Sequence, residues 1–334
     1  MPEISVVIPC YNEARYLPET LRALSLQTRA ADEIVLVDGG STDGTVSIAR
    51  EQADAFGLPL RILHNPARYI PHALNLGIDA AVGSHIARLD GHARPAPDYL
   101  ETCLEVWQAS DAALVGGVWE VVPGADTAMA EAIAIAGRTP LGSGGAAYRS
   151  GTATAQDVDT VPFGFFERQL WASVGRYDET LLTNEDYEFA ARIRKQGGRV
   201  RFDPRIRCTY FARADLGALA RQYWRYGWWK SRMLRRNPRE LRPRQVAPAL
   251  VGVGSLAAFG GAMARREARP FAGLYFGLYG ALLMVEAGRR SGFRPGIWAR
   301  LIGAYAVMHH AWGLGALAGT VFRGFGRNGR TRTV

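Results

Sequence analysis

The first 90 residues alternate between short runs rich in β-branched residues and longer segments with helical periodicity. This pattern predicts four strands with three helices between them: strands over 4–9, 33–38, 60–64 and 85–90, and helices over 14–26, 43–55 and 71–81. Strands and helices that alternate at these lengths favour a mainly parallel sheet with right-handed crossovers. We therefore expect an α/β fold with a Rossmann-like, mainly parallel sheet flanked by helices.

Polar residues follow the predicted strands at the points where the strands end. Tyr11-Asn12-Glu13, Asp38 and Asp90 all occupy such positions. A buried core position would not favour these side chains, and ligands of open α/β sheets bind beyond the carboxyl ends of the strands. The sequence therefore predicts a ligand site at this edge of the sheet.

The charge of the chain changes sign near residue 205. Residues 1–204 carry 17 Lys and Arg against 27 Asp and Glu, whereas residues 205–334 carry 23 against 4. An acidic body with a basic, apolar tail favours an enzyme held against anionic lipid and disfavours a nucleic-acid-binding protein. We predict a catalytic domain over 1–230 and a basic, apolar helical region over 231–334.

Three apolar segments in the tail are candidate membrane helices, over about 246–264, 270–287 and 301–322. The first has 19 residues without a charge, which as a helix is about 28 Å long and close to the ~30 Å hydrocarbon core of a bilayer. The connections are all basic, so the charge rule does not orient every segment, and re-entrant or interfacial segments stay open. Tight packing within a soluble helical domain is the alternative.

The compartment is indicated by the cysteines and the N-terminus. Cys10, Cys103 and Cys208 lie far apart without metal-ligand spacing, which favours buried, reduced thiols. The N-terminus lacks a basic stretch followed by an apolar signal region. We therefore expect the amino-terminal part to stay in the cytoplasm.

Two strand-end carboxylates suit a nucleotide and a metal. Asp38 precedes a glycine turn that can approach a nucleoside closely while the carboxylate accepts hydrogen bonds from base or ribose. Asp90-Gly91-His92 offers ligands to a divalent ion that would neutralise a diphosphate, and His92 suits Mn²⁺ better than Mg²⁺. Either motif alone is equally explained as a turn. No Gly-x-Gly-x-x-Gly follows a strand and no Gly-Lys-Ser/Thr loop occurs, which disfavours nicotinamide and P-loop chemistry.

Two further motifs lie beyond residue 180. Glu185-Asp186 begins a predicted helix, where the helix dipole and capping favour acids even without a catalytic role. The other motif lies in an aromatic, basic helix and consists of Gln222, Arg225 and Tyr226. It could equally be an interfacial anchor, because two tryptophans follow it closely.

Taken in order, these elements resemble the motifs of the family-2 glycosyltransferases, which have the GT-A fold. The resemblance covers roughly residues 4–230 and rests on Pro9-Cys10-Tyr11-Asn12-Glu13, the Asp38 turn, Asp90, Glu185-Asp186 and the glutamine-arginine-aromatic motif. The tail, with its Met308-His309-His310-Ala311-Trp312-Gly313 segment, is similar to that of bacterial exopolysaccharide transferases of the succinoglycan-biosynthesis type.

The resemblance implies a direct, inverting transfer from a nucleotide-diphosphate sugar, with Mg²⁺ or Mn²⁺ as cofactor. Asp186 would deprotonate the acceptor hydroxyl beside Glu185, while Asp90 and His92 would hold the metal. The nucleotide-sugar site would comprise Pro9, Tyr11, Glu13, Asp38, Arg68 and Asp90. The acceptor or the donor diphosphate would be bordered by Gln222, Arg225 and Tyr226. These roles suit the chemistry, because a positioned base and a neutralised leaving group lower opposite ends of one barrier.

Three positions bear on how closely the sequence matches the family and on the roles that the resemblance implies. Gly39 stands where the family commonly has a second aspartate after the second strand, which bears on the nucleoside contacts. His92 replaces the usual second aspartate of the metal motif, which bears on the choice of metal. Arg68 lies where related enzymes often place a basic contact to the nucleotide, although a solvated loop arginine is equally plausible.

We expect a transferase that extends a lipid-linked or polysaccharide acceptor in exopolysaccharide or cell-surface glycan synthesis. It would lie at the inner (cytoplasmic) membrane of a bacterium, with other polysaccharide-synthesis proteins as candidate partners and no nucleic acid. A UDP-hexose donor, UDP-glucose first, follows from the resemblance alone. The alternative is a non-catalytic membrane scaffold that binds nucleotide sugar, which the incomplete metal motif favours and Asp186 opposes. Sugar, acceptor and linkage are not identifiable from the sequence, and three short apolar segments favour single addition over polymerisation.

Overall fold

The structure, a computed structural model, describes residues 3–322 of the 334-residue chain. The chain divides into two compact units, one formed by residues up to 122 with 146–211 and the other by 123–145 with the residues from 212 onward. The predicted boundary lay at residue 230, whereas the second unit begins earlier. The reason is that the aromatic helix α10 (Leu216–Arg236) packs along α13 (Pro295–Val321) within this unit.

The first unit is built on a nine-stranded mixed sheet with the order β3-β2-β1-β4-β8-β6-β9-β5, and β7 pairs with β9. The strands are β1 (Ile4–Cys10), β2 (Glu33–Asp38), β3 (Leu60–His64), β4 (His85–Arg88), β5 (Arg94–Pro95), β6 (Ala112–Val122), β7 (Gln156–Asp157), β8 (Phe165–Glu167) and β9 (Arg199–Phe211). Strands β3, β2, β1 and β4 are parallel neighbours, as predicted, so their carboxyl ends share one edge. Strand β8 runs antiparallel to β4 and β6, and β9 runs parallel to β6.

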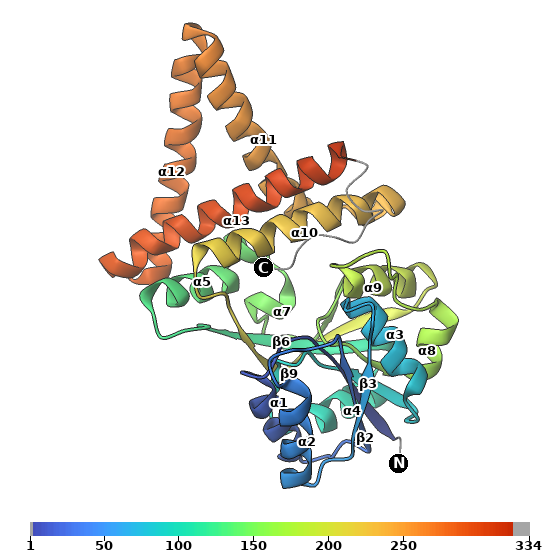
Figure 1. The fold of residues 1–334 in the computed structure, drawn as a ribbon. Helices are drawn as coiled ribbons and strands as arrows, with labels where there is room; N and C mark the ends of the chain where they lie inside the picture. The colour runs from blue at the N-terminus through green and yellow to red at the C-terminus, as the bar shows by residue number, and fades with distance from the viewer. Residues whose placement is uncertain (1–2, 323–334) are drawn as a thin grey trace. The chain divides into compact units, whose positions relative to one another are not determined.

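Helices cover both faces of this sheet (Figure 1). One buried cluster contains residues of α1 (Leu17–Ser25), α2 (Thr45–Phe56) and α4 (Tyr99–Ala109). The opposite cluster contains residues of α3 (Ile70–Ala80), α8 (Arg168–Val174) and α9 (Glu185–Lys195). The side chains of β1 alternate between the two, with Val6 and Ile8 in the first cluster and Val7 in the second, as a strand buried on both faces requires. The short α7 (Ala147–Ser150) completes the unit.

The second unit is helical and consists of α5 (Ala128–Arg138), α6 (Pro140–Ser143), α10, α11 (Pro243–Ala264), α12 (Arg269–Ser291) and α13, with two short 3₁₀ turns at Pro238–Glu240 and Arg266–Ala268. Helices α11 and α12 form a hairpin that stands off from α10 and α13, which lie side by side (Figure 1). The hairpin exposes large apolar side chains along its length, among them Leu250 (65% exposed), Phe259 (62%) and Phe271 (74%).

Within residues 3–322, two helices are long and apolar enough to cross a membrane, Pro243–Ala264 and Arg266–Ser291. They correspond to the first two predicted membrane segments. The third segment, 301–322, forms most of α13 and is not one of them; this helix packs against α10, α5 and α11. Small residues permit this packing: a Cβ added to Gly227 or Gly315 would clash with the backbone of the facing helix.

Candidate active site

Asp38 shapes the turn at the carboxyl end of β2. Its carboxylate is buried and accepts hydrogen bonds from the backbone N–H groups of Gly40 and Ser41 at 3.0 and 3.1 Å, and from the Ser41 hydroxyl at 2.5 Å. Gly40 has a φ of 81°, in the left-handed region that glycine adopts without strain. A carboxylate offers about four acceptor sites, so Asp38 retains capacity for a ribose or base, and its predicted nucleoside contact stays a prediction.

The loop after β1 is tied to this turn. Asn12, with a φ of 55°, donates its backbone N–H to Ser41 Oγ at 2.8 Å and accepts one from Thr42 N–H at 2.9 Å. The backbone N–H of Glu13 donates to Thr45 Oγ1 at 2.8 Å. The two strand-end loops therefore form one rigid rim at the carboxyl edge of the sheet.

Tyr11, Arg68 and Gly39 meet on this rim. The Arg68 guanidinium lies 5.4 Å from the centre of the Tyr11 ring. A Cβ on Gly39 would lie 3.3 Å from both Arg68 Cα and Tyr11 Cδ2, so a larger residue there would force the neighbouring loops to move. Pro9, also predicted in the nucleotide site, is buried within β1, and its role stays a prediction.

Arg88 joins the predicted base to the predicted metal ligand. Its side chain, 4% exposed at the end of β4, places Nη2 3.1 Å from Asp90 Oδ1 and 3.2 Å from Glu185 Oε1. Nη1 pairs with Asp186 Oδ2. The planar guanidinium suits such multiple carboxylate contacts. Sequence reasoning missed Arg88, although a charged residue in a buried strand seldom occurs unpaired and was a usable signal.

Asp186 lies in the first turn of α9 with its side chain 26% exposed. Burial raises the pKa of the Asp186 carboxyl to about 7, with Glu185 and Asp90 adding to the rise and Arg88 opposing it. A general base works best when its pKa lies near the working pH. Asp186 therefore combines access to a ligand with a pKa suited to accepting a proton.

We expect the kcat/KM of transfer, measured with limiting donor, to depend on the ionisation of Asp186. A base acts only when deprotonated, so kcat/KM should rise with pH, by up to tenfold per unit below the pKa of about 7, and level off above it. The measurement is a pH series from 5.5 to 9 at fixed, saturating Mg²⁺. A flat profile across that range would contradict the assignment.

His92 faces Glu13 at this edge. His92 Nδ1 lies 2.9 Å from Glu13 Oε1, and Gly91 lets this turn lie against β1, because a Cβ there would come within 2.6 Å of Cys10 Sγ. Burial, and then the charges of Glu13, Asp90 and other carboxylates, raise the pKa of the Cys10 thiol. The carboxylates near this thiol form a group of negative charges that would attract a cation.

Asp90 is the natural first ligand for such a cation, because its side chain remains 20% exposed. Among residues 3–322, no group of three or more His, Cys, Asp or Glu side chains is arranged to hold a metal ion. The residues present fit a divalent ion that takes most of its ligands from diphosphate oxygens and water, as Mg²⁺ commonly does. The metal role of Asp90 and His92 stays a prediction.

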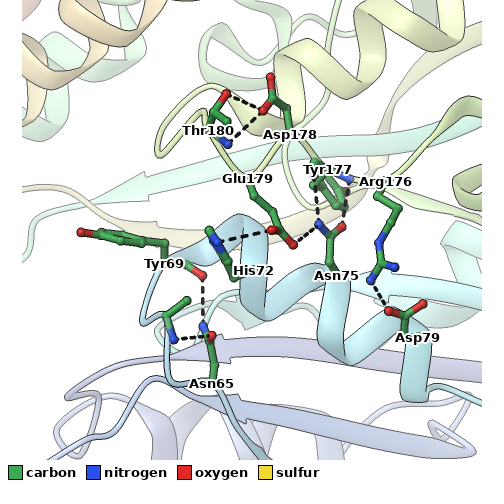
Figure 2. Close-up of polar contacts among 11 residues, drawn as sticks. Asn65, Tyr69, His72, Asn75, Asp79, Arg176, Tyr177, Asp178, Glu179 and Thr180 are labelled. Carbon is green, nitrogen blue, oxygen red and sulfur yellow. Dashed lines mark hydrogen bonds and ion pairs between the residues drawn. The ribbon is translucent and has the colours of Figure 1, made fainter. Parts of the chain in front are cut away.

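Helix α3 connects the rim formed by the strand-end loops to the loop that precedes Asp186. Asn75, 2% exposed, accepts the Tyr177 N–H at 2.9 Å and donates to the Tyr177 carbonyl at 3.0 Å and to Glu179 Oε1 at 2.9 Å (Figure 2). Asp79, a turn further on, pairs with Arg176 (Figure 2). The loop over 175–184 is therefore anchored before it reaches Glu185 and Asp186. Sequence reasoning missed Asn75, which contacts residues 102 positions away.

The glutamine-arginine-aromatic motif belongs to the second unit. Gln222 Nε2 donates to the Tyr226 hydroxyl at 2.9 Å on α10, one helical turn apart, and Arg225 is exposed. Their predicted place beside the acceptor or the donor diphosphate stays a prediction.

A Rossmann-like sheet with carboxylates gathered at its strand ends agrees with the GT-A fold. The family model of glycosyl transferase family 2 matches residues 5–168. The succinoglycan biosynthesis protein ExoA of Rhizobium meliloti (strain 1021) is 32% identical over 320 residues, which are 93% of this chain and 92% of that protein. The chain therefore belongs to glycosyltransferase family 2, as its motifs predicted.

Two further proteins are similar over most of the chain. One is the dolichyl N-acetyl-alpha-D-glucosaminyl phosphate 3-beta-D-2,3-diacetamido-2,3-dideoxy-beta-D-glucuronosyltransferase of Methanococcus voltae, 27% identical over 242 residues, covering 70% of this chain and 74% of that protein. The other is the structure of the mannosyltransferase PcManGT from Pyrobaculum calidifontis in complex with GDP-Man and Mn²⁺, with a TM-score of 0.63, 23% identity, and coverage of 92% and 87%. The second likeness confirms the GT-A fold.

Proposed function

We propose that this family-2 enzyme is a membrane-associated, inverting glycosyltransferase that moves a sugar from a nucleotide-diphosphate sugar to a lipid-linked or polysaccharide acceptor. The observation that carries the proposal is the cluster of Asp90, Glu185 and Asp186 around the buried Arg88. The similarity to a succinoglycan biosynthesis protein over nearly the whole chain supports a role in exopolysaccharide synthesis.

In the proposed mechanism Asp186 accepts the proton of the acceptor hydroxyl as its oxygen attacks the anomeric carbon. The bond from that carbon to the diphosphate breaks on the opposite face of the sugar, so the configuration inverts. A divalent ion held through Asp90 would neutralise charge on the departing diphosphate; the Mn²⁺ in the Pyrobaculum complex supports this cofactor class. Arg88 holds the carboxylates of Asp90 and Asp186 close together and compensates their negative charges.

The nucleotide and the sugar of the donor are proposed from the resemblance, with a UDP-hexose, UDP-glucose first, as the starting choice. On the rim, Tyr11 and Arg68 would meet the nucleotide, and Asp38 would accept hydrogen bonds from its ribose or base. The Pyrobaculum complex holds GDP-Man, so GDP-sugars belong in any test panel.

The experiment measures release of nucleoside diphosphate by the detergent-purified chain with a panel of UDP- and GDP-sugars, Mg²⁺ or Mn²⁺, and a lipid extract as acceptor. Release that requires one donor, a divalent ion and the lipid extract is the expected result. If a nucleotide sugar binds but no combination of metal and acceptor gives release, the non-catalytic scaffold becomes the better explanation.

The α11–α12 hairpin is the proposed membrane anchor. Helix α11 has 22 residues, about 33 Å at 1.5 Å per residue, which matches the ~30 Å hydrocarbon core. Large exposed apolar side chains in water are costly and mark contact with lipid or protein. We propose that the hairpin spans the inner (cytoplasmic) membrane of a bacterium twice, with the catalytic unit in the cytoplasm.

Spanning predicts that the turn between α11 and α12 lies outside the cytoplasm. We expect Glu267→Cys to react with a membrane-impermeant maleimide in spheroplasts, which lack the outer membrane but keep the cytoplasmic membrane intact. The matched control is Glu51→Cys on α2, which should react only after lysis, and the native cysteines are buried. Labelling of Glu267→Cys only after lysis would mean that the hairpin does not cross.

A further inference from the structure

Arg232, on α10, places its guanidinium group beside two tryptophan rings. It lies 5.0 Å from the centre of the Trp228 ring and 5.3 Å from that of the Trp229 ring. Its Nε and Nη2 atoms are buried, and neither has a hydrogen-bond partner in the part of the chain that the structure describes. Donors that are removed from water without a partner cost free energy, and charged donors cost more. The guanidinium is therefore held ready for an acceptor that the described chain does not supply.

Further positive charge surrounds this group. Arg235 and Arg236 follow three and four residues later, on the same side of the helix, and both are exposed. Burial, together with the charges of these two arginines, lowers the pKa of Arg232. Residues 225–244 contain eight Lys and Arg but one acidic residue, Glu240, which lies 3.5 Å from Arg242. The segment thus has a large excess of positive charge around Arg232.

We propose that Arg232, with Arg235 and Arg236, forms a binding site for the phosphate of an anionic phospholipid headgroup. A guanidinium fork binds phosphate oxygens in pairs, with shorter and stronger hydrogen bonds than neutral groups make. The inference rests on the membrane anchoring proposed above, because α11 begins at Pro243, soon after these arginines. Polybasic segments beside a membrane helix bind anionic lipid, and tryptophans favour the headgroup level.

The exposed side chains of the hairpin explain why a lipid rather than a soluble anion is proposed. Helix α11 begins soon after these arginines and exposes Leu250 in its early turns, so lipid would lie near the arginines when the hairpin is in a bilayer. Arg235 Nη1 donates to the Thr320 carbonyl at 3.4 Å, which orients this side chain against the end of α13. Free phosphate and the diphosphate of a lipid-linked acceptor share the same chemistry, and the test separates them.

The test is equilibrium binding of a fluorescent phosphatidylglycerol to the detergent-purified full chain, with unlabelled lipids and inorganic pyrophosphate as competitors. We expect phosphatidylglycerol to compete and phosphatidylcholine not to. Arg232→Gln should weaken binding about tenfold, as expected for losing one charge-assisted pair, and Arg232→Lys should weaken it less. Arg221→Gln, an exposed arginine on the same helix, is the matched control and should bind as the wild type does.

A stability measurement separates this role from simple packing. Without anionic lipid, Arg232→Gln should melt at the same temperature as the wild type or higher, because an unpaired, partly buried charge is removed. A lower melting temperature would instead indicate that Arg232 is structural and would overturn the proposal. Equal losses of binding in Arg232→Gln and Arg221→Gln, or competition by phosphatidylcholine, would also overturn it.

Two results separate the ligand sources and the underlying function. If inorganic pyrophosphate displaces the fluorescent lipid at the same concentrations as unlabelled phosphatidylglycerol does, the site binds a diphosphate and the headgroup proposal is overturned. Nucleoside diphosphate release by the wild type tests the transferase activity separately. If the wild type releases nucleoside diphosphate and Arg232→Gln binds lipid as well as the wild type does, only the lipid-site proposal fails. If the wild type binds lipid but releases no nucleoside diphosphate, the lipid-site proposal stands and the transferase proposal fails.

Discussion

Replacing Asp186 with asparagine is expected to lower the kcat of sugar transfer by about a thousandfold, within the range for losing a general base. The amide has nearly the same size as the carboxylate but does not accept the proton of the acceptor hydroxyl. Asp186 lies at the start of α9, whereas most of the predicted nucleotide contacts lie on the loops after β1, β2 and β3. The Kd for the nucleotide should therefore stay within about threefold, because the base acts on the acceptor rather than on the donor.

The matched control is Asp178→Asn, which lies in the loop before α9 and accepts hydrogen bonds from Thr180. It should retain wild-type kcat, since it has no predicted contact with the substrates. The measurement is initial-rate release of nucleoside diphosphate, with donor binding measured by calorimetry on the same preparations. Retention of more than about a tenth of wild-type kcat in Asp186→Asn would mean that another group takes the proton.

The parallel half of the sheet could be predicted from the sequence because its signals are local. The run over 33–38 forms β2 with the predicted bounds, and the predicted helix over 71–81 differs from α3 by one residue at each end. Strand β9 carries arginines along its length and was not predicted, since its partner β6 lies far away in the sequence. Long-range pairing rather than local periodicity determines such strands.

The candidate site could be predicted from the sequence at positions where the residue type itself indicates a chemical role. Asp90 and Asp186 stood out because carboxylates at strand and helix ends are suited to metal and proton chemistry. The contact that joins them passes through Arg88, and only the fold brings these residues together. Asn75 gave no signal, because an asparagine within a helix resembles any other polar residue until its partners in the loop before α9 are known.

Arg88 is expected to have the largest effect on stability of any residue in the site. Arg88→Met removes a cation that contacts Asp90, Glu185 and Asp186 together. Removing one partner of a buried ion pair costs about 3–5 kcal/mol of unfolding free energy, because the carboxylates lose the cation that compensates their charges. The melting midpoint of the full chain should fall by roughly 10 °C. Arg207→Met is the control, since Arg207 lies 3.9 Å from Glu120 with both side chains about half exposed, and exposed pairs contribute about 0–1 kcal/mol.

The combination of Arg88→Met with Asp186→Asn distinguishes an electrostatic role of Arg88 from a packing role. If the lost stability comes from carboxylates left without a cation, neutralising Asp186 removes part of the repulsion. The double variant should then melt at a higher temperature than Arg88→Met alone, a coupling that directly contacting residues commonly show. If Arg88 acts mainly by filling space, the second substitution adds no stability and the two variants melt alike. Recovery of the melting temperature in the double variant would show that Arg88 stabilises the cluster through its charge, and the same charge opposes the rise in the pKa of Asp186.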